Sequence, residues 1–500
     1  MLERKAAAAV VTVVLGGVLM RGALVAAAPR WGYVLDHFEV IGMGLVASER
    51  GILHAYSATA EDLPVIRGVM LMDGNPVLVD RRSIYAPNYP PLSILIFWAQ
   101  SAWLRATVSP LVVNTAYTRL VTSVAPWVGE AAVAVAVGLL TAALTPIRGR
   151  AIAAAAVAWL SPPLMMNTTL WSQYDALTLA ASVLAVLAMV RGRWTWAGIA
   201  AGTALLIKPQ GLLLAPIALF AAAVGAMRDG AIGAGATMRR AAVMLAAGIA
   251  TFALGSAPWL LGDGPALLRR CFQANLFEVL PYTTLEAYNL WYLVALLRER
   301  APVFDVLTAT APLGGATPDA WGRVLLALGL VAAAWLCWSR WRGRPDLAVV
   351  LFAALWLWSV FIWPTRVHER YILFCLPFVI VAAAVVPRLR WIAAALVLVA
   401  TMEHGWMIWR SGAPVGTFDR QSVDRLQGER MQAYWQGRPV TIENAKAGPQ
   451  IADTTVIAFA HYREERRRSI GAEWAVTLLS LAAYAAAMMV AARPRPAVRT

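Results

Sequence analysis

The chain of 500 residues contains few cysteines and few charged residues. Its three cysteines, at positions 271, 337 and 375, are too widely spaced for a disulfide framework or a zinc site. Charged residues make up 14% and hydrophobic residues 60%, whereas a soluble globular protein is about 45–50% apolar. We therefore exclude a soluble globular protein and expect the cysteines to be packing residues.

Strand-length alternation of polar and apolar residues is also lacking, so the sequence does not suggest a membrane barrel. Several apolar runs instead reach the ~20 residues that a helix needs to cross the ~30 Å hydrocarbon core. No internal repeat of about 20–50 residues is visible. The sequence predicts an all-α polytopic membrane protein.

Arginine groups lie between the apolar runs, and their placement predicts the topology. The net charge of +15 would suit nucleic acid, but the basic residues form small separate groups instead of one patch. We therefore expect no nucleic-acid partner, and we place these groups in the cytoplasm. The first apolar run, residues 6–28, is longer than the ~7–15-residue core of a signal peptide and is expected to remain as the first helix.

Roughly 12 crossings follow from this pattern, with both termini in the cytoplasm. A break is expected at Lys208-Pro209-Gln210, because proline removes a backbone donor. Residues 91–105 are predicted to form an interfacial or re-entrant helix. The basic cluster at 463–468 falls on the outer side, against the positive-inside rule. The predicted spans are 6–28, 120–145, 151–168, 176–190, 194–207, 211–226, 240–262, 322–339, 346–363, 371–387, 391–410 and 473–492.

The predicted organisation has five parts. They are an N-terminal membrane module (1–262) with a catalytic first outer loop (29–116), an extracytoplasmic loop (263–320), C-terminal membrane helices (321–410), a small extracytoplasmic segment (411–470), and a last helix with a cytoplasmic tail (471–500).

An acidic pair follows the first apolar run, in the stretch from Tyr33 to Val40. Asp36 and Glu39 are three residues apart, so on a helix along the membrane surface both carboxylates would share one face. Such a pair, where a span emerges into water, suggests acid-base chemistry. An ordinary helix start is the alternative, with Asp36 as N-cap and Glu39 at the third helical position.

Other unusual polar residues are expected on the outer side together with that pair. A transporter would instead place ionisable residues near the mid-plane, often in paired repeats. Arg366, His368 and Arg370 flank the end of a predicted span and suit a phosphate whose lipid tail stays in the bilayer. Headgroup snorkelling of the two arginines is the alternative.

Several short segments resemble motifs of one enzyme family, in that family's order. They are Asp36-His37-Phe38-Glu39, Asn88-Tyr89-Pro90-Pro91-Leu92, Trp171-Ser172-Gln173-Tyr174-Asp175, Leu206-Ile207-Lys208-Pro209-Gln210, Asn275-Leu276-Phe277-Glu278, Tyr288-Asn289-Leu290-Trp291 and Val367-His368-Glu369-Arg370. Through them the chain resembles the GT-C superfamily of membrane glycosyltransferases, and within it the glucosyltransferases that use dolichyl-phosphate glucose. The departures are Pro209 after the lysine, Asp175 where the family tends to have Asn, and Arg370 in place of Lys.

The resemblance implies a GT-C type fold and the transfer of one sugar from a polyprenyl-phosphate donor, with inversion at the anomeric carbon. Asp36, with Glu39 nearby, matches the family's catalytic acidic position and would act as general base. Glu369 would orient a cation. The candidates for holding the donor phosphate are Lys208, Arg366, His368 and Arg370. The candidates for binding the substrates are Tyr89, Gln173, Tyr174, Asp175, Glu278, Tyr288 and Trp291.

The expected partners are the polyprenyl-phosphate sugar, membrane lipid, and an acceptor that is a glycan, a glycolipid or a protein. Usage rich in alanine and arginine, with scarce lysine, suggests a bacterium with a GC-rich genome. The chain is therefore expected to be a multi-pass protein of the bacterial inner membrane, with its active site on the extracytoplasmic side and a carrier lipid other than dolichol.

No cofactor is expected, although Asp36, Glu39 and Asp175 carry oxygen ligands that Mg²⁺ or Mn²⁺ would accept. Two other functions stay open at this point. A flippase or transporter of lipid-linked sugars would have polar residues along the mid-plane. A ligase that transfers a whole lipid-linked glycan would need a wider acceptor groove.

Overall fold

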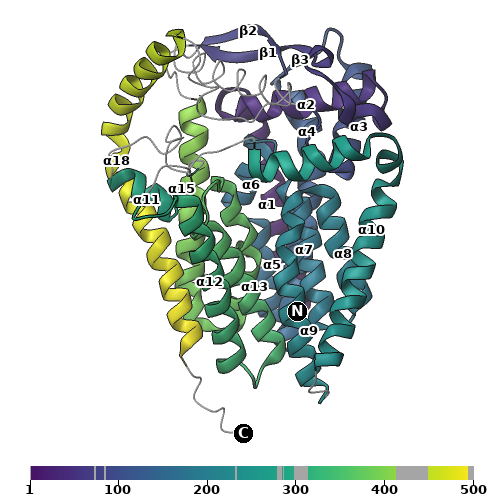
Figure 1. The fold of residues 1–500 in the computed structure, drawn as a ribbon, viewed down its shortest axis with the longest axis vertical. Helices are drawn as coiled ribbons and strands as arrows, with labels where there is room; N and C mark the ends of the chain where they lie inside the picture. Colours follow the sequence, from purple (N-terminus) through teal and green to yellow (C-terminus); the bar gives the residue numbers. More distant parts are fainter. Residues whose placement is uncertain are drawn as a thin grey trace.

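The computed structural model describes residues 2–72, 75–83, 86–230, 234–278, 284, 287–297, 313–412 and 449–493. Figure 1 shows a bundle of long helices with a small sheet and shorter helices at one end. Among the described helices, eight are long and apolar enough to cross a membrane, and two shorter apolar helices accompany them. The prediction of an all-α polytopic membrane protein is confirmed.

The first half of the bundle is built around the long helix α4 (Ala116–Leu144). Thr115 caps this helix, because its side chain accepts from the Thr118 backbone N–H while the Thr118 hydroxyl accepts from the Thr115 N–H. The other elements of this half are α1 (Leu2–Trp31), α5 (Arg148–Trp159), α6 (Pro162–Met165), η3 (Met166–Leu170), α7 (Asp175–Val190), α8 (Trp194–Ile207), η4 (Pro209–Leu213), α9 (Leu214–Arg228) and α10 (Ala234–Leu268).

The second half of the bundle packs against the first through α13 (Pro345–Ile362) and α14 (Leu376–Val385). Its other elements are η5 (Arg269–Glu278), α11 (Leu290–Leu297), α12 (Pro318–Arg340), η6 (Glu369–Phe374), η7 (Pro387–Leu389), α15 (Arg390–Gly412) and α18 (Pro449–Ala492). In Figure 1, α1 begins and α18 ends in the lower half of the view, away from the sheet. The predicted placement of both termini in the cytoplasm stays a prediction.

Helical segments coincide with each of the predicted spans, and the break at Lys208 is present between α8 and η4. The last helix differs from its prediction, because α18 begins at Pro449, well before residue 473. Hydropathy marks only the part of a helix that lies in lipid, and the polar first half of α18 carried no such signal. The side chains of the basic cluster at 463–468 lie outside the described part, as do residues 413–448.

The predicted first outer loop contains a sheet that the sequence reasoning did not anticipate. Strand β1 (Val65–Met72) pairs antiparallel with β2 (Asn75–Arg82) and parallel with the short β3 (Val112–Val113), so the strand order is β2-β1-β3. The other elements of this loop are α2 (Val34–Glu49), η1 (Ile52–Ser57), η2 (Ala60–Asp62) and α3 (Pro91–Thr107). α3 packs on α2, and its placement as an interfacial or re-entrant helix stays a prediction.

The sheet lies directly on α2. At Gly68 of β1, an added Cβ would come within 2.2 Å of the Phe38 ring, so only glycine allows this close approach. Phe38 is buried together with Ile41, Ile66 and Val113 between helix and sheet. This packing fixes α2, and with it the acidic pair, at the end of the bundle.

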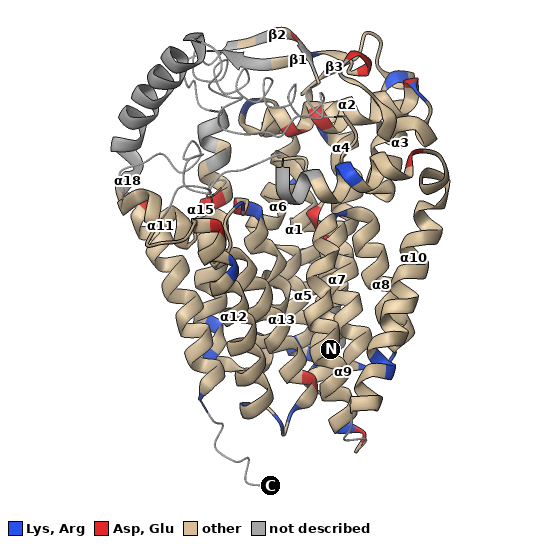
Figure 2. Cartoon of the chain, in the orientation of Figure 1, with Lys and Arg blue, Asp and Glu red and all other residues tan. Residues whose placement is uncertain are grey.

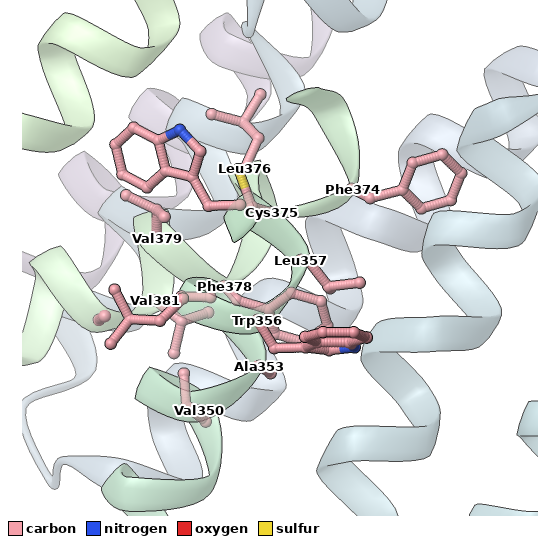
Figure 3. Packing of buried hydrophobic residues seen from close by; sticks show 14 of the residues in the cluster. Val350, Ala353, Trp356, Leu357, Phe374, Cys375, Leu376, Phe378, Val379 and Val381 are labelled. Carbon is pink, nitrogen blue, oxygen red and sulfur yellow. The ribbon is translucent and has the colours of Figure 1, made fainter. Parts of the chain in front are cut away.

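The main apolar core lies inside the helical bundle. Figure 3 shows part of it, where Trp356 of α13, Phe378 of α14 and Cys375 pack among aliphatic side chains. All three cysteines are buried and free, as predicted for packing residues. Figure 2 shows the charged residues gathered toward the two ends of the bundle, with few in the middle. This distribution is expected of a protein whose middle lies in hydrocarbon.

Candidate active site

Asp36 lies in the first turn of α2, and its side chain is 26% exposed. Tyr33 is the N-cap of this helix, so the alternative of Asp36 as N-cap is wrong. The Asp36 carboxylate has another role. Its Oδ2 accepts hydrogen bonds from the Trp171 indole N–H, at 2.8 Å, and from the Gln173 side-chain amide.

The two oxygens of Asp36 have different surroundings. Oδ2 receives the Trp171 and Gln173 bonds and lies 3.9 Å from the Arg370 guanidinium. None of the contacts in the described part of the chain falls on Oδ1. The carboxylate is therefore anchored through one oxygen and presents the other for a further hydrogen bond.

Glu39 is buried, with 3% of its surface exposed, and its contacts differ from those of Asp36. The Ser83 hydroxyl donates to Glu39 Oε2 at 2.6 Å. Ser83 follows β2, so this bond ties the end of the hairpin to α2. The contact gives Glu39 a supporting position beside Asp36.

The turn from Trp171 to Asp175 joins the π-helical segment η3 to α7 and carries the groups that hold Asp36. Trp171 is buried and its ring stacks on Tyr33 at 4.8 Å. Ser172 adopts a φ of 61°, a backbone conformation that is uncommon for a residue with a side chain. The turn directs the indole of Trp171 and the amide of Gln173 to the same carboxylate oxygen.

Lys208 lies at the break between α8 and η4, and its side chain is 4% exposed. Its Nζ is 2.6 Å from Asp175 Oδ1 and 3.0 Å from Gln173 Oε1, and it lies over the Tyr89 ring at 5.4 Å. Gln173 therefore accepts from Lys208 while it donates to Asp36. A buried lysine needs such partners, because an isolated ammonium group would be costly there.

Arg370 connects the two sides of the site. Its Nη1 lies 3.9 Å from Asp36 and 3.3 Å from Glu369 Oε1. Burial disfavours its charge, but Glu369 and then Asp36 outweigh that effect and raise the pKa of Arg370. Gln210 of η4 donates to the Tyr371 hydroxyl at 2.7 Å, so the Lys208 break is also bonded to the segment that carries Arg370.

His368 and Glu369 precede Arg370 and set its electrostatic surroundings. Burial, followed by the charge of Arg370, lowers the pKa of His368. Burial also opposes ionisation of Glu369, but the interactions with His368 and Arg370 outweigh it and lower the pKa of Glu369 to about 2. Glu369 is therefore an anion that holds Arg370, and His368 is neutral near pH 7.

The structure does not bring all of the predicted site residues to this cluster. Arg366 lies 4.0 Å from Asp319 and adopts a φ of 63°. Tyr174 points into the packing of α3 and α4, where it contacts Phe97 and donates to Thr122 O at 3.1 Å. Sequence spacing places a residue near a site but does not give the direction of its side chain.

Of the other three residues predicted to bind the substrates, two lie elsewhere in the fold, and the side chain of the third is outside the described residues. Tyr288 is buried in the main core, and its backbone N–H donates to Glu403 at 2.7 Å. Trp291 is buried and donates to Trp363 O at 2.7 Å. Both therefore have structural contacts near α13 and α15. The side chain of Glu278 lies outside the described residues.

Trp171 and Arg119 were not among the predicted site residues. Trp171 lies inside one of the motifs that resemble the enzyme family, and this position was the signal that could have identified it. Arg119 is a charged residue at the start of a long apolar run, and such residues are uncommon inside spans unless they have a role. Arg119 is completely buried and donates to Ser172 Oγ at 2.9 Å.

The three carboxylates considered for a metal have separate partners. Asp36 accepts from Trp171, Glu39 accepts from Ser83, and Asp175 pairs with Lys208. Within the described ranges, no group of three metal-binding side chains was found. These three carboxylates do not share a common site, and the expectation of a cofactor-free protein stays a prediction.

Comparison with known proteins adds little to this description. Neither a model of a known family nor a curated protein matches the chain. Among solved structures, the chain is similar to ArnT from Cupriavidus metallidurans, crystallised with bound undecaprenyl phosphate. The two chains are 13% identical, the match covers 96% of this chain and 76% of that one, and the TM-score is 0.40. A match at this level assigns neither a family nor a ligand to the chain.

Proposed function

We propose that the protein is an inverting glycosyltransferase of GT-C type. It moves a single hexose from a polyprenyl-phosphate donor to a glycan, glycolipid or protein acceptor, on the extracytoplasmic side of a bacterial inner membrane. The observation that carries this proposal is the Asp36 carboxylate, which is anchored through Oδ2, without a described contact on Oδ1, and adjacent to Arg370.

The arrangement of Asp36 supports its role as general base. A hydroxyl group is a weak nucleophile until its proton is removed, and a positioned carboxylate contributes roughly 10²–10⁴ to such a step. As the acceptor oxygen bonds to the anomeric carbon, its proton passes to Asp36 Oδ1. The hydrogen bonds on Oδ2 keep the carboxylate in place during this transfer.

Arg370 and Lys208 would stabilise the leaving group. The bond between the anomeric carbon and the phosphate oxygen breaks, and its electron pair leaves with the polyprenyl phosphate. Preorganised cations stabilise this developing charge, and each such group is typically worth ~10²–10³ in rate. Glu369 and Asp175 hold the two cations, so little rearrangement is needed when the phosphate gains charge.

The position of the cluster suits a donor with a lipid tail. Asp175 begins α7, Lys208 follows α8, and Arg370 lies between α13 and α14. These are ends of apolar helices, at the end of the bundle where α2 also lies (Figure 1). A phosphate held there leaves its polyprenyl chain beside the helices and presents the sugar toward the loop elements.

The order of the family-like motifs along the chain supports the proposed reaction class. The chain resembles the polyprenyl-phosphate-sugar-dependent glucosyltransferases at the acidic loop helix, the Trp171 turn, the Lys208 break and the His368 to Arg370 segment. The structure brings Asp36, Gln173, Asp175, Lys208 and Arg370, drawn from all four segments, into one cluster.

The described charged residues near the mid-plane give no support to a transporter. Arg21 and Glu130, the mid-plane charges that would suggest one, are buried and paired with each other. Glu403 accepts from the Tyr288 backbone. Each of these groups has a structural partner inside the bundle.

The proposal is tested with purified protein in lipid vesicles. The vesicles are incubated with radiolabelled polyprenyl-phosphate sugars and a lipid extract of acceptors, and the products are separated by thin-layer chromatography. We expect label to move from the donor to a new product, with free polyprenyl phosphate released in equal amount. Movement of intact donor across the vesicle membrane without a new product would identify a flippase instead.

A further inference from the structure

Arg119, in the first turn of α4, is a completely buried arginine whose described contacts are all with neutral groups. Its guanidinium donates to Asn114 Oδ1 at 2.8 Å and to Ser172 Oγ at 2.9 Å. It also donates to Leu170 O and Tyr33 O, both at 3.1 Å. Among the ion pairs of the described residues, none involves Arg119. A completely buried cation is costly unless polar partners hold it, and here four neutral acceptors and the nearby charge of Asp36 do so.

Three of the four acceptors of Arg119 belong to the segments that carry Asp36 and Trp171. Tyr33 is the N-cap of α2, the helix of Asp36. Leu170 and Ser172 flank Trp171, whose indole N–H donates to Asp36. One guanidinium therefore binds the backbone of Leu170 and the side chain of Ser172 on either side of Trp171, and the backbone of Tyr33 just before the helix of Asp36.

Two of the residues whose side chains accept from Arg119 have an uncommon backbone conformation. Asn114 and Ser172 both adopt a φ of 61°, and both accept a hydrogen bond from this guanidinium. Such conformations persist only where surrounding contacts hold them, and they cluster at functional sites. Arg119 supplies one such contact to each of the two residues.

The link between α1 and α2 passes directly over the guanidinium. At Gly32, an added Cβ would lie 2.8 Å from Leu170 O and 3.0 Å from Arg119 Cζ. A side chain there would push the start of α2 away from the Trp171 turn. Gly32 and Arg119 together permit the close approach that brings Asp36 to Trp171.

We propose that Arg119 is a positioning residue for the reaction, resting on the proposed role of Asp36 as general base. It holds the Trp171 turn and the start of α2 in register, so that the Asp36 carboxylate is anchored through Oδ2 and Oδ1 faces the acceptor hydroxyl. Because Arg119 has no exposed surface, it does not touch substrate and acts through Trp171 and Tyr33.

A lysine at position 119 is the sharpest substitution. It keeps the positive charge but offers one nitrogen, which cannot span the separate acceptors that a planar guanidinium reaches. In Arg119→Lys we expect kcat for sugar transfer to fall about 10–100-fold, because a small misplacement of a reacting group costs that much. The Kd for the donor should stay within about threefold, since Lys208 and Arg370 are not altered.

Arg344→Lys is the matched control. Arg344 donates to Leu144 O at 3.0 Å, at the opposite end of the same helix α4. This substitution also removes a guanidinium bond to a backbone carbonyl, but it lies far from Asp36. Its kcat should stay within about twofold of the wild type.

A second variant tests whether Arg119 acts through Trp171. Trp171→Phe removes the indole N–H that anchors Asp36 Oδ2. If both residues serve the same carboxylate, the double variant should lose less activity than the sum of the two single effects. Independent, fully additive losses would overturn the proposed route.

Labelling of Asp36 with a carbodiimide, measured by mass spectrometry of the purified protein, needs no turnover. We expect several-fold faster labelling in Arg119→Lys and unchanged labelling in Arg344→Lys. Unchanged labelling in Arg119→Lys, with kcat either retained or lost only in proportion to thermal stability, would overturn the positioning role. A wild type without transferase activity would refute the proposed function, yet the labelling comparison would still decide the role of Arg119.

Discussion

The Asp36 carboxylate lies 3.9 Å from the Arg370 guanidinium, although one residue begins the first loop and the other follows α13. The oxygen that faces Arg370 also accepts the indole N–H of Trp171. A cation and two neutral donors therefore converge on Oδ2. This convergence gives the site one fixed carboxylate and one arginine in the same place, as a base and a leaving-group clamp require.

Replacement of Arg370 by glutamine should affect donor use strongly. The variant keeps a polar side chain but removes the charge beside Asp36 and Glu369, so we expect kcat/KM for the polyprenyl-phosphate sugar to fall about 10²–10³-fold. Steady-state transfer assays with varied donor measure this change. Arg366→Gln serves as control and should have a much smaller effect, because Arg366 lies against Asp319. Equal losses in the two variants would contradict the assignment of Arg370.

Substitutions in the Lys208–Asp175 pair should separate the effect of the pair on folding stability from its effect on sugar transfer. Asp175→Asn leaves a buried lysine without its anion, so we expect the free energy of unfolding to fall by about 3–5 kcal/mol. The double variant Lys208→Met with Asp175→Leu should recover most of this stability but show no sugar transfer. Thermal unfolding in lipid nanodiscs and transfer assays separate the two effects. Recovery of transfer in the double variant would show that the pair is only structural.

His37 should make folding stability depend on pH. Burial, followed by the charge of Arg119, lowers the pKa of His37 well below 6.5. Below about pH 6.5 the unfolded chain therefore binds a proton that the folded protein excludes. The free energy of unfolding rises as the pH increases toward about 6.5. Wild-type protein should lose stability between about pH 7 and pH 5, and His37→Gln should lose less. Identical pH dependence of the melting temperatures would contradict this account of His37.

Removal of divalent metal should leave transfer unchanged. Asp36, Glu39 and Asp175 each have a separate protein partner, so they are not free to converge on one ion. Protein dialysed against EDTA should keep its kcat and its affinity for donor. A loss of activity that Mg²⁺ or Mn²⁺ restores would show that the carboxylates rearrange around a metal.

The sequence predicted the polytopic helical fold well, because long apolar runs mark the helices that can lie in lipid. The sidedness predicted from the arginine groups stays a prediction. The sequence also predicted the break at Lys208 and the placement of His368 to Arg370 beside a span. These features depend on local chemistry, such as a proline after a lysine or a basic group at a helix end. The segment carrying Arg370 and the loop helix carrying Asp36 then meet in the folded protein.

The sheet and several side-chain directions were not predicted. The dipeptide Asp73-Gly74, between two runs rich in valine and isoleucine, is a hairpin signal that the strong helical pattern obscured. Arg366 belongs to the same short segment as Arg370, yet the two arginines contact different acidic residues. Arg366 has a positive φ, which turns the backbone at that position. The spacing of residues in a sequence does not show such a turn.

The supporting contacts of Asp36 also depend on tertiary structure. Trp171 and Gln173 reach the carboxylate from a turn far along the chain, and Arg119 holds that turn from a third segment. A sequence motif identifies the candidate catalytic residue. The groups that donate hydrogen bonds to that residue depend on how three segments fold against one another.

Asp36 is proposed to be the general base, and substitution of its carboxylate tests this role. Asp36→Asn keeps the shape of the side chain and an oxygen that accepts from Trp171, but the amide cannot take up a proton from the acceptor hydroxyl. Glu39→Gln is the matched control, because Glu39 is one turn further along α2 and is bonded to Ser83. It should have a smaller effect on turnover.

The most direct measurement compares kcat for sugar transfer and Kd for the polyprenyl-phosphate donor in the wild type and in Asp36→Asn. We predict that kcat falls about 10²–10⁴-fold while Kd changes little, since the cations that hold the phosphate remain. An Asp36→Asn protein that keeps near-normal turnover would contradict the assignment of Asp36 as the base.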